Sequence, residues 1–196
     1  MGTHDDAAPA AQAQTDASAA SAKGDPVPDV AKEVREPNPR DVARQIVLRQ
    51  LALAPRSRAE LMQKLAQRGC TDDVAVAVLD RMTQVGLVDD QAYAQMLVRS
   101  QQAGRGLARR ALARELRTKG IEADVADEAL SCISEEDERD RARALVDKKL
   151  RAMHGLGIEA QTRRLAGMLA RKGYHSRVTY AVIRQALADA PEHLPD

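Results

Sequence analysis

"LARELRTKGIEADVADEALSCI", residues 112–133, is one of three similar segments in the chain. The other two are "LMQKLAQRGCTDDVAVAVLDRM", residues 61–82, and "LAGMLARKGYHSRVTYAVIRQA", residues 165–186. In each segment a Lys or Arg directly precedes a central glycine, leucines stand four and eight residues before it, and a valine stands five residues after it. The three glycines are Gly69, Gly120 and Gly173. A unit that recurs in this way indicates a repeat protein.

Each segment predicts two helices that meet near the glycine. Apolar residues recur at spacings of three and four, which is the period of a helix rather than of a strand. Glycine can adopt the left-handed backbone that ends a helix, and the preceding base favours the negative helix end. Asp72 or Asp73, and Asp124, stand where an N-cap of the second helix is expected.

A further helical segment precedes each pair, which predicts an all-α fold of three tandem three-helix repeats. These first helices are expected at roughly 41–54, 89–103 and 136–153. The predicted repeats are repeat 1 (40–88), repeat 2 (89–135) and repeat 3 (136–190). No repeat can bury its apolar face alone, so neighbouring repeats should pack against each other in a row.

Residues 1–39 differ in composition from the rest of the chain. They consist mainly of Ala, Gln, Ser, Pro and Asp, and their net charge is −4, which leaves +5 for residues 40–196. Such a segment buries too little apolar surface to offset its chain entropy, so we predict a disordered acidic tail.

Several classes of protein are disfavoured by the composition. No apolar run approaches the ~20 residues needed to span a bilayer, and the acidic N-terminus lacks the apolar core of a signal peptide. Cys70 and Cys132 stand far apart and suggest no disulfide framework, so a cytoplasmic protein is expected. The chain has no Phe or Trp and three Tyr, too few rings for a platform on which several bases stack.

Motifs of catalysis and metal binding are missing as well. The four histidines are scattered, neither cysteine stands in a zinc pattern, and no phosphate-binding glycine-rich loop follows a strand. We therefore expect a protein that is not an enzyme and that needs no cofactor or metal.

One segment concentrates positive charge although the whole chain carries only +1. On a helix over 107–119, Leu112 and Leu116 form the buried side, and Arg110, Arg114 and Arg117 form a second stripe that faces elsewhere. Neither of the other repeats has all three bases at the aligned positions, so the fold does not require them. One interpretation is a solvated surface; the alternative is a surface that binds phosphates or acidic protein. The charged run "EEDERDRARALVDKKL" likewise fits a partner surface or a solvated helix face with i,i+4 ion pairs.

A block within repeat 2 resembles the signature of the RecX family, the bacterial regulators of RecA recombinase. The block is "GLVDDQAYAQMLVRSQQAGRGLARRALARELRTKGI", residues 86–121, and the similarity extends over roughly 41–188. The family pattern usually has Phe where this chain has Cys70 and Tyr174. The resemblance implies a curved row of three three-helix repeats without catalytic residues.

The resemblance also implies a partner. RecX proteins lodge in the groove of the RecA filament on single-stranded DNA and damp its ATP hydrolysis, strand exchange and co-protease activity, in DNA repair, recombination and the SOS response. The basic residues expected to face RecA or DNA are Arg99, Arg105, Arg109, Arg110, Arg114, Arg117 and Lys119. We expect a monomer. The alternative is a direct DNA-binding protein of the helix-turn-helix type, although the second helices of repeats 1 and 2 are acidic or apolar.

Overall fold

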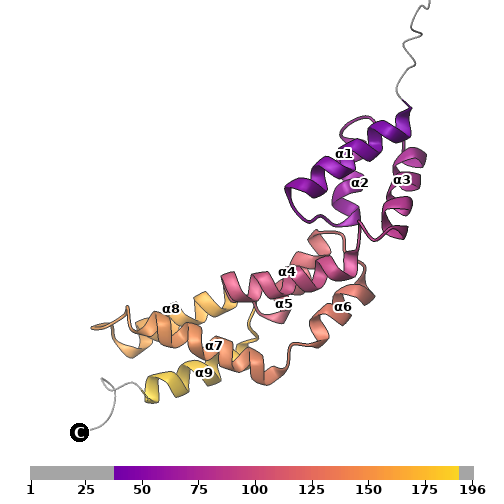
Figure 1. Cartoon of the computed structure of the whole chain (residues 1–196). Coiled ribbons are helices and arrows are strands. Elements are labelled where there is room, and N and C mark those ends of the chain that lie inside the picture. Colours follow the sequence, from indigo (N-terminus) through magenta and orange to yellow (C-terminus); the bar gives the residue numbers. More distant parts are fainter. Residues whose placement is uncertain (1–37, 190–196) are drawn as a thin grey trace, which may run out of the picture. The chain divides into compact units, whose positions relative to one another are not determined.

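A computed structural model describes residues 38–189 of the chain. These residues form nine α-helices and no strand (Figure 1). The helices are α1 (Pro39–Leu53), α2 (Arg58–Ala66), α3 (Asp72–Gln84), α4 (Asp90–Arg105), α5 (Arg109–Thr118), α6 (Ala123–Ser131), α7 (Glu135–Leu150), α8 (Ile158–Arg171) and α9 (Ser176–Ala188). The predicted all-α fold of three tandem three-helix repeats is confirmed.

The predicted disordered tail, residues 1–39, lies outside the described residues except for its last two positions. Asn38 is the N-cap of α1, its side chain accepting a hydrogen bond from the Arg40 N–H, and Pro39 is the first residue of that helix. The last residue of the predicted third repeat, residue 190, also lies outside the described part.

Capping residues define where the helices begin. Ser57 and Glu60 form a capping box at α2, and Ser134 and Asp137 form another at α7. The expected aspartate caps of the other helices are wrong: Thr71 is the N-cap of α3 and Glu122 that of α6.

The misplaced aspartates lie inside the first helical turn, where a negative charge still interacts favourably with the helix dipole. Asp73 reaches back to the start of its helix. Hydrogen bonds from the Thr71 side chain and the Val74 N–H hold the pKa of the Asp73 carboxyl below its ordinary value.

The three basic-Gly turns have the same backbone. Gly69, Gly120 and Gly173 have positive φ angles of 78°, 70° and 89°. In each turn the N–H of the residue after the glycine donates a 3.1 Å hydrogen bond to the carbonyl of the leucine five residues earlier. The pairs are Cys70–Leu65, Ile121–Leu116 and Tyr174–Leu169. This is the Schellman helix end, and it confirms the left-handed role predicted for the glycines.

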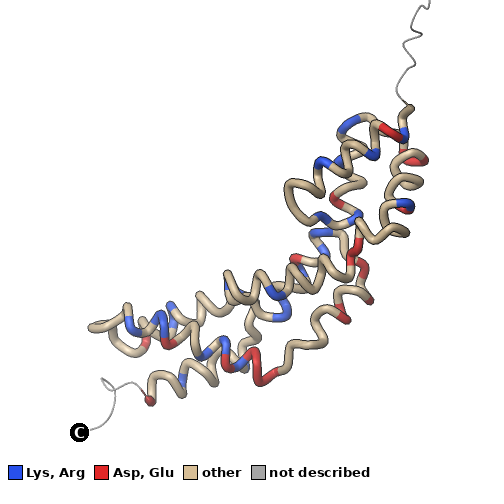
Figure 2. Tube along the Cα trace, viewed as in Figure 1, with Lys and Arg blue, Asp and Glu red and all other residues tan. Residues whose placement is uncertain are grey.

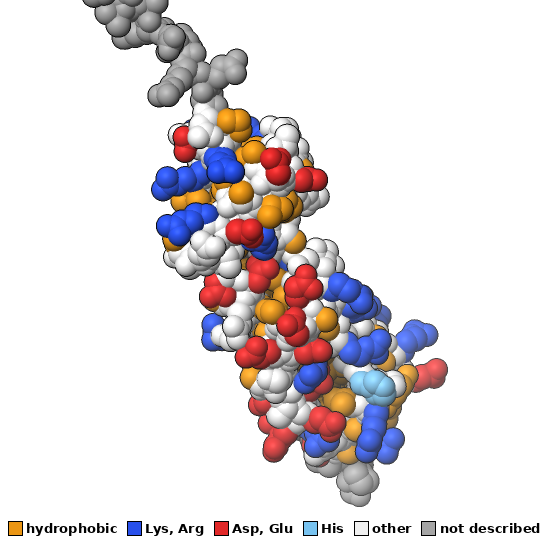
Figure 3. Space-filling model, turned by 90° about the vertical axis from the view of Figure 1, so that its right-hand side faces the viewer, with side chains coloured by type: hydrophobic (Ala, Val, Ile, Leu, Met, Phe, Trp, Pro, Cys, Tyr) orange, Lys and Arg blue, Asp and Glu red, His pale blue; other side chains and the backbone are white. Residues whose placement is uncertain are grey.

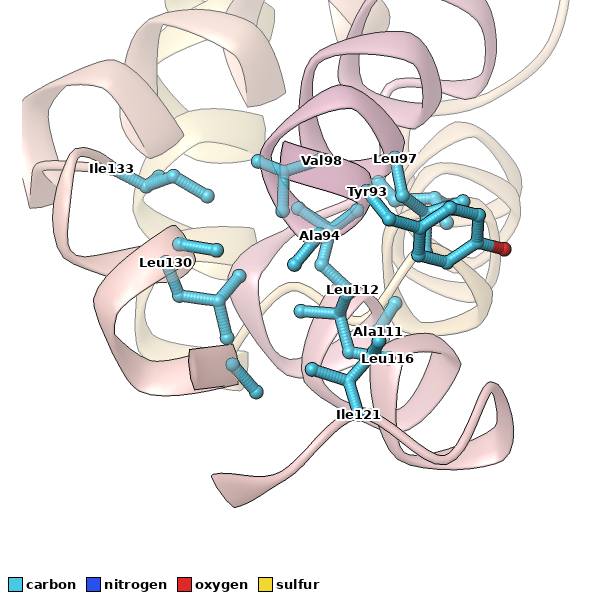
Figure 4. Close-up of a cluster of buried hydrophobic side chains, with 13 residues drawn as sticks. Tyr93, Ala94, Leu97, Val98, Ala111, Leu112, Leu116, Ile121, Leu130 and Ile133 are labelled. Atoms are coloured by element: carbon cyan, nitrogen blue, oxygen red, sulfur yellow. The ribbon is translucent and has the colours of Figure 1, made fainter. Parts of the chain in front are cut away.

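Each repeat has a core of its own, in which the first and third helices pack together and the second covers them. Figure 4 shows the core of repeat 2, where Leu112 and Leu116 point toward the side chains of α4 and α6. Both leucines are completely buried, and the equivalent leucines of the other repeats are at most 1% exposed. The leucines predicted from the repeat alignment are therefore core residues.

Neighbouring repeats join through the same two kinds of contact. At the junction of repeats 1 and 2, the Ser57 hydroxyl donates a 2.6 Å hydrogen bond to the carbonyl of Lys119. At the next junction, the N–H of Ala108 donates a 2.9 Å hydrogen bond to the carbonyl of Lys172. Lys119 and Lys172, the basic residues before Gly120 and Gly173, thus dock their carbonyls on the preceding repeat, at the start of that repeat's second helix.

The second kind of contact is a carboxylate at the same helix start. The Arg58 N–H donates to Asp90 at 2.8 Å, and the Arg109 N–H donates to Glu138 at 2.8 Å. In both cases the first helix of one repeat supplies an anion to the positive N-terminus of the preceding repeat's second helix.

Candidate partner-binding surface

The arginine stripe (Arg110, Arg114 and Arg117) lies on the outer side of α5. The buried leucines of α5 turn its other side toward the core, so all three arginines are exposed. Among the described residues no carboxylate lies within ion-pair distance of any of the three guanidinium groups. The stripe therefore presents three unneutralised positive charges to solvent.

Arg110 and Arg114 also line a hollow of about 370 Å³, called here the stripe hollow, between α5 and repeat 3. The other lining residues come from α8, α9 and the turn between them: Ala166, Ala170, Gly173, Tyr174, His175, Ser176, Thr179 and Tyr180. Tyr180 is 54% exposed, whereas Thr179 is buried and its hydroxyl has no hydrogen-bond partner among the described residues. The stripe hollow combines two cations, an exposed ring and small polar groups, which suits a phosphate carrying a planar base.

Two of the other predicted site residues have partners within the protein. The Lys119 ammonium donates to Glu60 at 2.7 Å, in the junction of repeats 1 and 2. The Arg105 guanidinium lies 3.5 Å from Glu115 and 3.3 Å from the Gln101 side-chain oxygen. Lys119 thus holds two repeats together, and its charge is neutralised there.

The remaining predicted residues are Arg99 on α4 and Arg109 at the start of α5. Both are exposed. The structure therefore brings Arg110 and Arg114 together at one hollow, continues them with Arg117 along α5, and assigns Lys119 to a different contact.

The contact with Lys119 changes the pKa of Glu60. Burial alone would raise the pKa of the Glu60 carboxyl. This effect is outweighed by hydrogen bonds from Lys119, the Ser57 N–H and the Tyr93 hydroxyl and by the positive charge of Lys119, so the pKa is lowered. Burial, with the nearby Glu60 charge, raises the pKa of Tyr93 to about 12. Glu60 is thus held as a carboxylate and Tyr93 as a neutral donor.

Sequence reasoning missed the contribution of repeat 3 to this surface. Tyr180 stands far from the stripe in sequence and occurs in an amphipathic helix, α9. The available signal was a large aromatic side chain placed off the buried side of α9. That side is already filled by Thr179, Val182 and Ile183, so the ring of Tyr180 is exposed.

Opposite charges are separated on the molecule. On the face in Figure 3, blue Lys and Arg side chains of the lower half gather along the right edge, while red Asp and Glu side chains lie toward the middle and left. Figure 2 shows that α7 begins with red positions; blue positions predominate after them, with Asp140 and Asp147 in between. An exposed acidic surface also covers α6, through Asp124, Asp127 and Glu128.

Three protein-family models match this chain. Models of the first, second and third three-helix domains of RecX match residues 43–82, 89–130 and 135–187. The chain belongs to the RecX family. The matched ranges follow the three repeats in order, so the resemblance predicted from the sequence is confirmed.

Relatives and solved structures agree with this assignment. The regulatory protein RecX of Streptomyces coelicolor is 50% identical over 81% of this chain and 86% of its own length. The regulatory protein RecX of Mycobacterium avium is 47% identical over 78% of this chain and 89% of its own. The crystal structure of RecX from Lactobacillus salivarius has the same fold, with a TM-score of 0.68 and 18% identity, over 76% of this chain and 96% of that one.

Two features are absent from the described part of the chain. No helix there combines the length and the apolar character needed to cross a membrane. Nor does residue range 38–189 contain a group of three or more His, Cys, Asp or Glu side chains that could hold a metal ion.

Proposed function

We propose that this RecX-family protein regulates RecA by binding the RecA filament on single-stranded DNA and inhibiting its ATP hydrolysis, recombinase and co-protease activities. The observation that carries the proposal is the arginine stripe, whose three exposed guanidinium groups have no carboxylate partner among the described residues. A filament on DNA offers both phosphates and acidic protein surface to such a stripe. The protein acts in the cytoplasm, as a monomer, in DNA repair and the SOS response.

Within this function we assign the seven predicted basic residues unequal roles. Arg110, Arg114 and Arg117 form the contact surface because they are exposed and unpaired. Arg99 and Arg109 extend that surface, whereas the Arg105 guanidinium lies 3.5 Å from Glu115 and outside it. Lys119 acts indirectly, since its ammonium fixes the position of repeat 2 on repeat 1 through Glu60.

The test reverses the charge of the stripe. In the variant Arg110→Glu/Arg114→Glu/Arg117→Glu, inhibition of RecA's DNA-dependent ATP hydrolysis should require at least about tenfold more protein, because attraction becomes repulsion. The matched control is Arg44→Glu/Arg49→Glu/Arg68→Glu, which makes the same charge change at three exposed positions of repeat 1. Circular dichroism first establishes equal helicity of all three proteins.

The control should inhibit nearly as well as the parent, and inhibition by the parent should weaken with added salt. A stripe variant that inhibits as well as the parent would contradict the proposed surface. Binding to three samples, namely RecA on DNA, free RecA and bare DNA, separates the proposal from direct DNA binding. A protein that binds bare DNA as tightly as the filament would instead favour the direct DNA-binding alternative.

A further inference from the structure

A second basic hollow, called here the α7 hollow, lies between α4, α7 and α8 where repeats 2 and 3 meet. Its volume is about 640 Å³. Five cationic side chains line it: Arg105, Arg141, Lys148, Lys149 and Lys172. No carboxylate is among the described residues that line it.

The α7 hollow and the stripe hollow open on opposite sides of α8. Met168 and Lys172 line the α7 hollow, whereas Ala166 and Ala170 line the stripe hollow. Residues two apart in an α-helix point about 200° away from each other, so the two sets face in nearly opposite directions. A ligand in one hollow therefore leaves the other accessible.

Arg141 adds a charged donor group to the lining of the α7 hollow. One nitrogen of its guanidinium, Nη1, is buried and has no hydrogen-bond partner among the described residues. Arginine remains charged in proteins, and a buried charged donor without an acceptor is costly. In native structures most such groups are satisfied by protein, water or an ion.

Three acidic residues of α7 bond to other groups. Asp137 belongs to the capping box with Ser134, and Glu138 accepts the Arg109 N–H. Asp147 pairs with Arg143 at 2.9 Å, and Arg143 also pairs with Asp189 at 2.9 Å. The Lys172 ammonium donates to the Arg105 carbonyl at the end of α4, so it adds a further positive charge at the hollow without neutralising any. Lys148 and Lys149 are exposed on the rim.

The floor of the α7 hollow is apolar and contains no aromatic ring. The apolar lining residues are Ala103, Ala144, Leu145, Ala152 and Met168. Single-stranded nucleic acids gain much of their affinity by stacking bases on aromatic rings, which the stripe hollow offers through Tyr180 and the α7 hollow does not. An acidic peptide with an aliphatic side chain fits both parts, because its carboxylates meet the cationic rim while the aliphatic group covers the floor.

We propose that the α7 hollow binds an acidic peptide segment of a partner protein, anchored by an aliphatic side chain on the Leu145–Met168 floor. Carboxylates of the peptide pair with Lys148 and Lys149, and the Arg141 charge adds to the attraction. This inference does not rest on the proposed function, because the peptide site and the arginine stripe lie on opposite sides of α8.

The experiment uses the full chain and a fluorescent peptide of glutamates around one central leucine, with binding followed by anisotropy. The variant Lys148→Glu/Lys149→Glu should bind the peptide at least about tenfold more weakly. The variant Arg110→Glu/Arg114→Glu makes the same charge change at the stripe hollow and should bind within about twofold of the parent. Arg141→Gln, which keeps a polar side chain but removes the charge, should also weaken binding.

Two control peptides test the two parts of the site. Replacing the glutamates by glutamine should abolish binding, and replacing the leucine by serine should weaken it. The proposal is wrong if the parent does not bind the glutamate peptide, or if the Lys148/Lys149 variant binds it as well as the parent. It is also wrong if oligothymidylate displaces the peptide and loses its own affinity in the Lys148/Lys149 variant, because the α7 hollow would then take nucleic acid.

Discussion

Gly173 in repeat 3 lies directly against the backbone of Ala111 in repeat 2. A Cβ placed on Gly173 would stand 2.7 Å from the Ala111 backbone nitrogen, which is closer than real Cβ atoms approach. Gly120 makes the equivalent close approach to Ala59 of repeat 1, whereas a Cβ on Gly69 would meet nothing within 4 Å. The glycines of repeats 2 and 3 therefore end a helix and also allow two repeats to meet.

Gly173→Ala should destabilise the protein more than Gly69→Ala. Both glycines have positive φ angles, so in both variants an alanine must adopt a left-handed backbone, which costs about 1–2 kcal/mol. Only Gly173→Ala adds a collision with the preceding repeat, for a total loss of about 3 kcal/mol. Urea unfolding of the two variants provides the measurement. Equal losses would mean that the contact with Ala111 relaxes without cost.

Leu112→Asp should unfold repeat 2. The side chain is completely buried among α4, α5 and α6, and an unpaired carboxylate in that core costs about 4 kcal/mol or more. The control Arg114→Asp places the same carboxylate on the exposed side of the same helix and should cost about 1 kcal/mol or less. Helical circular dichroism and thermal melting distinguish the two. A Leu112→Asp protein that melts with the parent would refute the repeat alignment.

Glu60→Gln should reduce the dependence of stability on acid pH. The folded protein holds the pKa of Glu60 below its ordinary value. The carboxylate therefore stabilises the fold above that ordinary value, and its contribution is lost as the pH falls through the lowered pKa. At neutral pH the variant should be less stable by about 1 kcal/mol, since the pair with Lys119 is partly exposed. Urea midpoints of parent and variant should differ at neutral pH and converge in acid, once the pH is below the lowered pKa of Glu60. A constant difference between them would rule out this linkage.

Alkaline pH should destabilise the protein through two buried tyrosines. Burial raises the pKa of both Tyr93 and Tyr174 to about 12, while an unfolded tyrosine ionises near 10. Between about pH 10 and pH 12 the unfolded chain loses tyrosine protons that the folded protein keeps. The free energy of unfolding therefore falls by about 1–2 kcal/mol per tyrosine. The decline should be shallower in Tyr174→Phe, and Tyr180→Phe, at an exposed ring, is the control. Identical alkaline curves for all three proteins would contradict the prediction.

Removal of residues 1–37 should leave folding intact. This segment is acidic and poor in large apolar residues, and the first described helix carries its own cap, Asn38. The shortened chain 38–196 should melt as cooperatively as the full chain. A large loss of cooperativity would show that the segment contributes to the fold.

The sequence by itself determined the features that depend on local pattern. The threefold recurrence of leucines around Gly69, Gly120 and Gly173 was enough to predict the helices, the turns between them and the buried residues, because helix period and glycine conformation act over a few residues. The exposure of the arginine stripe followed from the same period. The exact N-cap residue could not be predicted in this way, since Thr71 and the two aspartates after it are all good N-cap candidates for α3.

Only the tertiary structure decided which charges are available to a partner. Lys119 looks like the other bases of its segment, yet its ammonium is held by Glu60 of the preceding repeat. Tyr180 joins the stripe hollow, and Arg141 gathers with Lys172 at the α7 hollow, in both cases with residues far away in sequence. These groupings arise because repeats pack on one another through contacts between residues far apart in the chain, and no local period encodes such contacts.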